Sequence, residues 1–179
     1  LDETPVHGKL GIGHTRWATH GVPSEANSHP HFDDQQEIAV VHNGIIENYL
    51  ELGAELRAQG VQFRSETDTE TVAHLIRHYY DGDLFAAVKR ALQDVKGAYA
   101  VGVVCKDDPD VLIAARNGSP LIVGLGDQCN YIEIGATAIL DYSRDVLYLG
   151  DGQVCAVRRD GYTVQTLDGE ARTLEVHTV

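Results

Sequence analysis

The fold is decided by the stretch Ile38-Ala39-Val40-Val41-His42-Asn43-Gly44. Its first five residues form a short, mostly apolar run with several β-branched side chains, which predicts a buried strand ending at His42. Asn43-Gly44 is a strong hairpin signal and predicts a type I′ turn. A helix rather than a second strand follows, however, with Asn48 as its expected N-cap and Glu51 in capping-box spacing. The sequence therefore leaves two interpretations of Asn43-Gly44: a turn, or the end of a strand that leads into a helix.

After this strand, apolar residues at helical spacing predict three helices. They cover residues 48–59, which should stop at Gly60, and residues 69–80 and 84–92. Short apolar runs between turn signals such as Asp108-Pro109 predict a series of strands at residues 98–105, 111–116, 121–123, 131–134, 146–149, 154–158 and 162–166. Strands this closely spaced argue against a doubly wound parallel sheet. We therefore predict a layered α+β fold in which the first two helices lie side by side on one sheet.

The composition excludes some classes of function. The 179 residues include 14 Lys and Arg against 27 Asp and Glu, a formal net charge of −13. This balance argues against a broad surface for nucleic acid or anionic membrane, and no apolar stretch approaches the roughly 18 residues that span a bilayer. The chain starts at Leu1 and has no methionine. We therefore expect one domain, residues 1–179, that is incomplete at its N-terminus.

Cysteine and histidine usage gives no metal or disulfide pattern. The three cysteines, Cys105, Cys129 and Cys155, are odd in number and widely spaced, which fits a reducing cytosol. Cys105 ends an apolar run and is expected in the core. The histidines around His29-Pro30-His31 show no zinc-binding spacing, so we expect no metal site.

The densest polar cluster is the segment His14-Thr15-Arg16-Trp17-Ala18-Thr19-His20-Gly21. The planar guanidinium of Arg16 can hold a carboxylate with two hydrogen bonds, and Trp17 offers a flat wall with one donor. The segment could line a binding site. The alternative is an exposed arginine packed over a core tryptophan.

Two further clusters complete the candidate site. If Asn43-Gly44 is not a turn, the Asn43 side-chain amide and the Gly44 backbone N–H could form an oxyanion hole. Within Ser65-Glu66-Thr67-Asp68-Thr69-Glu70, the acids could cap a helix, or Asp68 could point outward and bind an ammonium group. Together with Arg16, these groups would suit an amino acid that has a reactive side-chain carbonyl, and glutamine fits this description.

Several motifs resemble one known family. They are His14 to Gly21, Pro23-Ser24-Glu25, Asn27, His29-Pro30-His31, Val41-His42-Asn43-Gly44-Ile45-Ile46-Glu47-Asn48, Ser65 to Glu70, Lys96-Gly97-Ala98-Tyr99-Ala100 and Ala114-Ala115-Arg116-Asn117-Gly118-Ser119-Pro120-Leu121. These motifs are similar to the glutaminase domain, a class II glutamine amidotransferase domain, of the glucosamine-6-phosphate synthase (glutamine–fructose-6-phosphate aminotransferase) family. The resemblance covers nearly the whole chain.

The resemblance implies an N-terminal-nucleophile hydrolase fold, a four-layer αββα sandwich of antiparallel sheets, with no cofactor. It implies that Arg16 holds the glutamine carboxylate and Asp68 its ammonium group, and that Asn43 and Gly44 form the oxyanion hole. Trp17, Thr19 and His20 would shape the pocket. The implied parent is a cytoplasmic homo-oligomer, in which ammonia from glutamine reaches sugar-phosphate isomerase domains.

The chain departs from this family at two places. The family's nucleophile is an N-terminal cysteine, and none of the three cysteines begins the chain, so we expect these 179 residues alone to be inactive. In addition, Glu133-Ile134-Gly135 stands where the family usually has a Ser-Asp pair. The alternatives are a non-catalytic relative that binds an amino acid or is structural, and the glutaminase domain of another class II amidotransferase, such as phosphoribosyl-pyrophosphate amidotransferase.

Overall fold

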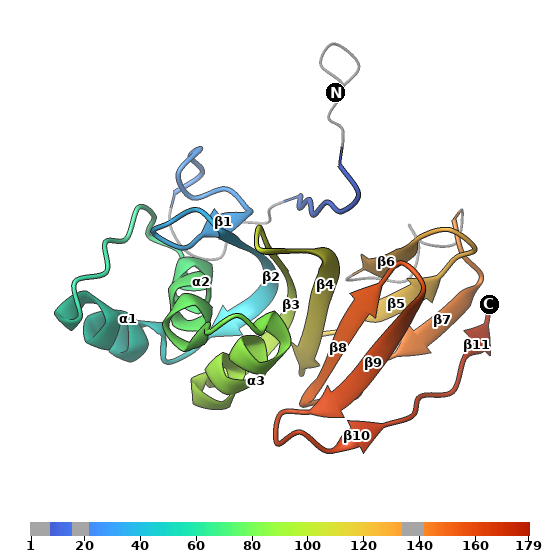
Figure 1. The fold of residues 1–179 in the computed structure, drawn as a ribbon. Coiled ribbons are helices and arrows are strands. Elements are labelled where there is room, and N and C mark those ends of the chain that lie inside the picture. The colour runs from blue at the N-terminus through green and yellow to red at the C-terminus, as the bar shows by residue number, and fades with distance from the viewer. Residues whose placement is uncertain (1–7, 16–21, 134–141) are drawn as a thin grey trace, which may run out of the picture.

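The computed structural model describes residues 8–15, 22–133 and 142–179. Within these residues the chain forms a helix layer, a seven-stranded sheet and a four-stranded sheet (Figure 1). All strand pairs that they contain are antiparallel, which confirms the predicted α+β class. Three of the four layers implied by the resemblance are thus present in the described part of the chain, where no helix covers the outer face of the smaller sheet.

The seven-stranded sheet has the order β1-β2-β3-β4-β8-β9-β10. Its strands are β1 (His31–Phe32), β2 (Ile38–Ile46), β3 (Gly97–Cys105), β4 (Asp108–Asn117), β8 (Gln153–Arg158), β9 (Gly161–Thr166) and β10 (Ala171–Arg172). The four-stranded sheet has the order β11-β7-β5-β6. Its strands are β5 (Ile122–Leu125), β6 (Asn130–Glu133), β7 (Asp145–Tyr148) and β11 (His177–Thr178).

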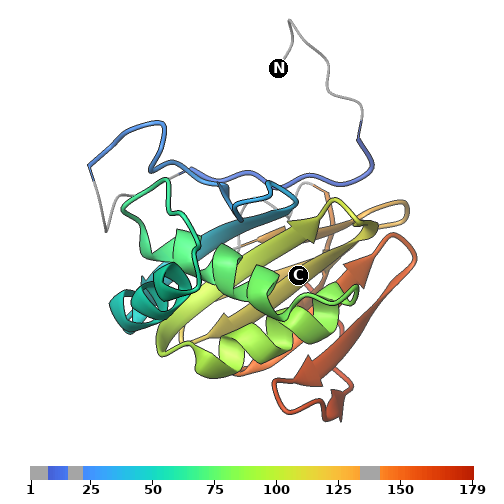
Figure 2. The same cartoon turned by 60° about the vertical axis from the view of Figure 1, so that its left-hand side comes forward.

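Three described helices, α1 (Tyr49–Ala58), α2 (Asp68–Tyr79) and α3 (Leu84–Asp94), cover one face of the larger sheet (Figure 2). Apolar side chains from all three pack with Val40 and Val101 in one core, because each helix turns a single apolar face to the sheet. The helices α1 and α2 also contact each other. The predicted placement of these two helices side by side on one sheet is therefore confirmed.

A second core fills the space between the two sheets. Leu112, Ala114 and Val157 of the larger sheet pack there against Val123 and Leu147 of the smaller sheet. Side chains alternate between the two faces of a strand, so β2 contributes to both layers. Ile38, Val40 and Ile46 face the helices, whereas Val41 faces Ile132 of β6 across a cavity described below.

Asn43 and Gly44 lie inside β2, so the turn interpretation was wrong, whereas the strand leads into helix α1 as the second interpretation expected, ending two residues later than Gly44. The strand continues to Ile46 and pairs with β3, with Gly44 opposite Tyr99. Gly44 has a φ of 131°, and a Cβ atom built there would lie 2.0 Å from the Ala98 carbonyl oxygen. Only glycine fits this conformation and this close approach, which explains how a turn-like dipeptide is accommodated within a strand.

Two other local predictions need correction. Asn48 is the N-cap residue of α1, but its side chain forms no capping bond. Instead, its amide donates to the Asp94 carbonyl at 2.9 Å and accepts from the Lys96 N–H at 2.8 Å. The predicted turn at Asp108-Pro109 belongs to β4, and the turn lies at residues 106–107. For Asn48, contacts with distant parts of the chain override the local pattern; at the hairpin, the pairing of Cys105 with Asp108 sets the turn two residues earlier.

Candidate functional site

Asn43 lies on the wall of a cavity of about 620 Å³. The cavity is bounded by β2, by β6 of the smaller sheet and by residues 9–15. Asn43 projects from the same face of β2 as Val41, which also lines the cavity. Thr15, the last described residue before Arg16, lines it too. The N-terminal side of the polar segment at residues 14–21 is thus brought next to Asn43.

His14 contacts the candidate oxyanion donor directly. Its Nε2 atom forms a short hydrogen bond with Asn43 Oδ1, although 29 positions separate the two residues. The His14 ring stacks on that of His29, with 4.2 Å between centroids and an interplanar angle of 30°. His29 in turn meets His31 edge to face at 4.8 Å. The sequence alone indicates no separate role for His14, because a contact with Asn43 has no local signature.

The start of α2 holds three histidine rings through two threonine hydroxyls. Thr69 Oγ1 lies 2.9 Å from His42 Nδ1 and 3.2 Å from His29 Nε2. Thr67 Oγ1 lies 3.0 Å from His31 Nε2. A hydroxyl can donate to one partner and accept from another, so Thr69 can link both of its rings. His29, His31 and His42 therefore belong to a hydrogen-bonded and stacked wall. The described residues contain no group of three or more His, Cys, Asp or Glu side chains arranged to hold a metal.

His42 is buried on the helix side of β2. Burial disfavours the charged form of its ring and lowers the pKa of His42 to about 4, against an opposing effect of Asp68 and with a smaller contribution from His14 and His31. At neutral pH His42 is therefore an uncharged partner of Thr69.

Asp68, the predicted ligand for an ammonium group, is the first residue of α2 and is buried. Its Oδ2 atom accepts a hydrogen bond from the Ile46 N–H at 2.9 Å. It does not line the cavity that Asn43 lines. The expectation that its side chain points outward was therefore wrong, and its role toward an ammonium group stays a prediction.

Glu70 lies in the first turn of α2, as the helix-capping interpretation expects, but the N-cap residue Thr67 forms no side-chain cap bond, and Glu70 binds the preceding loop instead. Its carboxylate accepts hydrogen bonds from the backbone N–H groups of Arg64 and Ser65, at 2.7 Å and 2.6 Å. Burial alone would raise the pKa of Glu70, but hydrogen bonds from His74, Ser65 and Arg64 lower it to about 2. Glu70 thus fixes the loop that leads into α2, and the position of Asp68 with it.

Four predicted substrate-binding residues, Arg16, Trp17, Thr19 and His20, lie outside the described residues. Ile134 and Gly135, where the sequence departs from the family pattern, also lie outside them. The convergence of Arg16 with Asp68 and Asn43 on one pocket stays a prediction.

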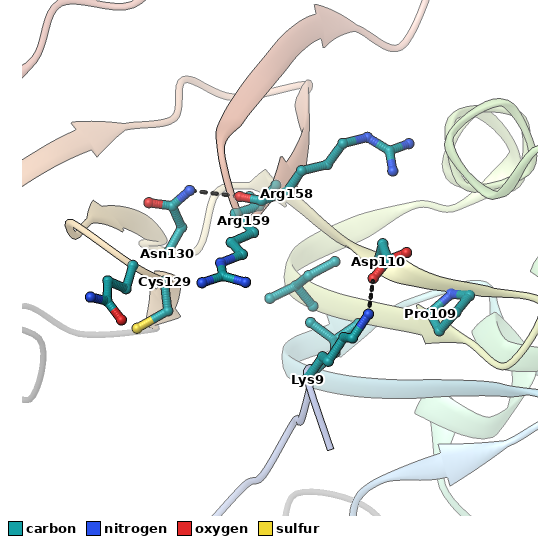
Figure 3. A pocket seen from close by; sticks show the side chains of 11 residues that line it. Lys9, Pro109, Asp110, Cys129, Asn130, Arg158 and Arg159 are labelled. Carbon is teal, nitrogen blue, oxygen red and sulfur yellow. Dashed lines mark hydrogen bonds and ion pairs between the residues drawn. The ribbon is translucent and has the colours of Figure 1, made fainter. Parts of the chain in front are cut away.

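A smaller cavity of about 300 Å³ adjoins the first and shares Lys9, Cys129 and Asn130 with it. Figure 3 shows the ion pair at its edge, with 3.7 Å between Lys9 Nζ and Asp110 Oδ1. Both side chains of this pair are largely exposed, so it contributes little to stability. Cys129 is also exposed, with its sulfur 2.8 Å from the Tyr131 hydroxyl.

Comparison with known proteins identifies the family. A family model described as a glutamine amidotransferase domain matches residues 14–131. This chain belongs to that family. The amidotransferase domain is 51% identical over 169 residues to the glutamine–fructose-6-phosphate aminotransferase [isomerizing] of Fusobacterium nucleatum, covering 94% of this chain and 28% of the relative. The corresponding protein of Thermus thermophilus is 52% identical over 169 residues, with the same coverage. The domain therefore spans less than a third of the length of these relatives.

Solved structures support the fold of the amidotransferase domain. The glutamine phosphoribosylpyrophosphate amidotransferase from B. subtilis matches 86% of this chain and 34% of its own, with a TM-score of 0.70 and 27% identity. A glutamine aminotransferase class-II domain protein from Silicibacter pomeroyi covers 79% of this chain and 70% of its own, with a TM-score of 0.58 and 14% identity, which bears on the fold alone. The predicted N-terminal-nucleophile fold and the family resemblance are both confirmed.

Proposed function

We propose that this chain is the glutamine-binding and glutamine-hydrolysing domain of a glutamine–fructose-6-phosphate aminotransferase. In that role it supplies ammonia for the conversion of fructose 6-phosphate to glucosamine 6-phosphate. The observation that carries the proposal is the identity of about one half to such enzymes over 94% of the chain. Structural neighbours that act on phosphoribosylpyrophosphate share only 27% identity, which favours the sugar-phosphate enzyme over the alternative amidotransferase.

The proposed reaction begins when a cysteine thiolate attacks the side-chain carbonyl carbon of glutamine. The carbonyl π electrons move onto oxygen, and the Asn43 amide and the Gly44 N–H stabilise the resulting oxyanion. The carbon–nitrogen bond then breaks, ammonia leaves with a proton from the enzyme, and a thioester remains. Water hydrolyses the thioester to glutamate and restores the thiol.

Binding roles in this proposal fall to side chains with matching charge. Arg16 holds the glutamine carboxylate through its planar fork, and Asp68 holds the ammonium group. Trp17, Thr19 and His20 shape the pocket. These assignments rest on the family resemblance and on the chemistry of each side chain.

None of the cysteines in the sequence suits the role of nucleophile. Cys105 and Cys155 are buried, and burial raises the pKa of Cys155 to about 12, which keeps it a thiol. Cys129 is exposed in the connection before β6, inside the chain and not at an N-terminus, and its sulfur contacts the Tyr131 hydroxyl. We therefore expect a polypeptide of these 179 residues alone to release no glutamate.

The parent protein would add sugar-phosphate isomerase domains that receive the ammonia. We propose that it is a cytoplasmic homo-oligomer that binds neither nucleic acid nor membrane, in keeping with the net charge of −13. Among the described residues no helix has the length and apolar character required to cross a bilayer.

The proposal is tested with the complete gene product that contains this sequence. It is given glutamine labelled with ¹⁵N in the side-chain amide, together with fructose 6-phosphate, and we expect glutamate release and label in glucosamine 6-phosphate. Glutamine binding without glutamate release would favour a non-catalytic relative. In a parallel reaction that supplies phosphoribosylpyrophosphate in place of fructose 6-phosphate, transfer of label to that acceptor would favour the other amidotransferase.

A further inference from the structure

The His14 ring is placed to hold the Asn43 side-chain amide in one orientation. We infer that His14 is a positioning residue for the oxyanion hole: it occupies Asn43 Oδ1 and thereby leaves Asn43 Nδ2 free to stabilise the oxyanion. The inference rests on the proposed function for its catalytic consequence. The contact itself, between His14 Nε2 and Asn43 Oδ1, is a feature of the structure.

Hydrogen-bond chemistry gives the direction of this contact. An amide oxygen is only an acceptor, so Nε2 of His14 must carry the proton and donate it. The other ring nitrogen, Nδ1, is buried and has no partner in the described part of the chain. The contact with Oδ1 therefore places the proton on Nε2 and leaves Nδ1 as an unprotonated acceptor.

The Nδ2 end of the Asn43 amide has no hydrogen-bond partner among the described residues, while Asn43 lines the cavity of about 620 Å³. An amide free to rotate by half a turn could present its oxygen to the oxyanion, and two oxygens that both carry negative charge repel each other. A donor fixed on Oδ1 removes that alternative.

The position of His14 is itself determined by neighbouring elements. Its ring stacks on His29, which Thr69 holds through a contact of 3.2 Å between Oγ1 and Nε2. His31 packs against His29 from another side and lies 3.0 Å from Thr67 Oγ1. The first turn of α2 therefore supports His29, His29 supports His14, and His14 orients Asn43. The motif His29-Pro30-His31, which has no assigned role in glutamine binding, thus has a role in positioning His14.

Two substitutions in the complete enzyme separate the hydrogen bond from the ring stack. His14→Phe keeps a ring to stack on His29 but removes the Nε2 donor, whereas His14→Gln keeps an N–H donor but removes the ring. We expect His14→Phe to lower kcat by about 10–10²-fold with KM changed less than about twofold, because a small misplacement of a catalytic group costs up to ~10²-fold. His14→Gln should recover at least part of kcat.

A double-mutant cycle with Asn43→Ala gives a decisive comparison. If His14 acts through Asn43, His14→Phe should cost little when Asn43 is already alanine. Equal cost in both backgrounds, a wild-type kcat in His14→Phe, or an effect confined to KM would each overturn the inference. Activity of the wild-type enzyme tests the proposed function separately.

The hydrogen bond can also be measured without catalysis. With ¹⁵N-histidine in the complete protein, we expect a slowly exchanging proton on the His14 Nε2 atom, identified by its loss in His14→Phe and weakened in Asn43→Ala. A neutral His14 ring with its proton on Nδ1 would mean that the Asn43 amide is reversed. That result would overturn the inference even in an active enzyme.

Discussion

The backbone N–H of Ile46 donates a hydrogen bond to the carboxylate of Asp68, with 2.9 Å between N and Oδ2. The bond joins the last residue of β2 to the first residue of α2, and the carboxylate is buried. The strand that carries Asn43 is thereby fixed to the helix whose threonines hold the histidine rings. Asp68 has a structural role in addition to the proposed one toward the substrate.

Substitutions at Asp68 can separate these two roles. Asp68→Asn keeps an oxygen that can accept from Ile46, so we expect stability close to wild type but a KM for glutamine raised by about 10-fold or more, because the charge partner of the ammonium group is lost. Asp68→Ala loses both the negative charge and the acceptor oxygen. It should therefore also reduce the free energy of unfolding by ~1–3 kcal/mol. Steady-state kinetics and urea unfolding provide the measurements. An unchanged KM in Asp68→Asn would remove Asp68 from the binding site.

Asn43→Ala should act on the chemical step. The amide is proposed to contact only the developing oxyanion, so kcat should fall by roughly 10²–10³-fold while KM changes little. Glutamate release by the complete enzyme is the measurement. A rise in KM at unchanged kcat would instead assign Asn43 to ground-state binding.

Arg16→Lys should weaken glutamine binding. An ammonium group keeps the positive charge but cannot form the two parallel hydrogen bonds of a guanidinium with a carboxylate. We expect KM to rise with kcat nearly unchanged, and Arg90→Lys on the exposed surface of α3 to change neither. Equal kinetics for Arg16→Lys and the wild type would show that Arg16 does not hold the carboxylate.

Gly44→Ala should destabilise the domain strongly. The new Cβ would lie 2.0 Å from the Ala98 carbonyl oxygen, at a residue with a φ of 131°. We expect a loss on the order of 3–5 kcal/mol in urea unfolding, within the range of severe steric substitutions. Gly60→Ala is the matched control, since Gly60 also has a positive φ of 95° but open space around it, and should cost only about 1–2 kcal/mol. Similar losses for both would contradict the steric explanation.

The burial of His42 predicts acid sensitivity. Its pKa is about 4 in the folded chain against 6.5 in an unfolded one, so the unfolded state binds the proton first. The contribution of uncharged His42 to the free energy of unfolding is fully present above pH 6.5. It is lost as the pH falls toward 4, which lowers the free energy of unfolding by on the order of 3 kcal/mol. Urea unfolding between pH 7 and 4 should show a shallower pH dependence in His42→Asn than in the exposed control His78→Asn. Equal slopes would contradict this assignment.

Sequence patterns predicted the elements well where the cause is local. Leu84, Val88, Ala91 and Leu92 share one helical face, and all four are buried in α3. The buried position of Cys105 was also correct. Such patterns depend on periodicity, which the sequence displays directly.

The errors and omissions depend on distant partners. Asn48 has the local features of an N-cap, yet its amide bonds to Asp94 and Lys96, 46 and 48 positions away. The contact of His14 with Asn43 likewise joins two motifs that the sequence displays separately. The sequence motifs indicate which chemical groups form the candidate site. Tertiary contacts determine which of these side chains orients another.

Gly44 and Gly97 lie on neighbouring strands, β2 and β3. At each glycine, a backbone carbonyl group of the other strand approaches closely. A Cβ on Gly97 would lie 2.2 Å from the Ile45 oxygen, just as one on Gly44 would meet Ala98. A shift of β2 by one residue along β3 would bring Asn43 or Ile45, both with side chains, into the place of Gly44. The shifted pairing would also turn Asn43 from the cavity toward the helices. The two glycines thus act as a register lock that excludes misaligned pairings of β2 and β3, and Asn43 reaches the cavity only in the one alignment they permit.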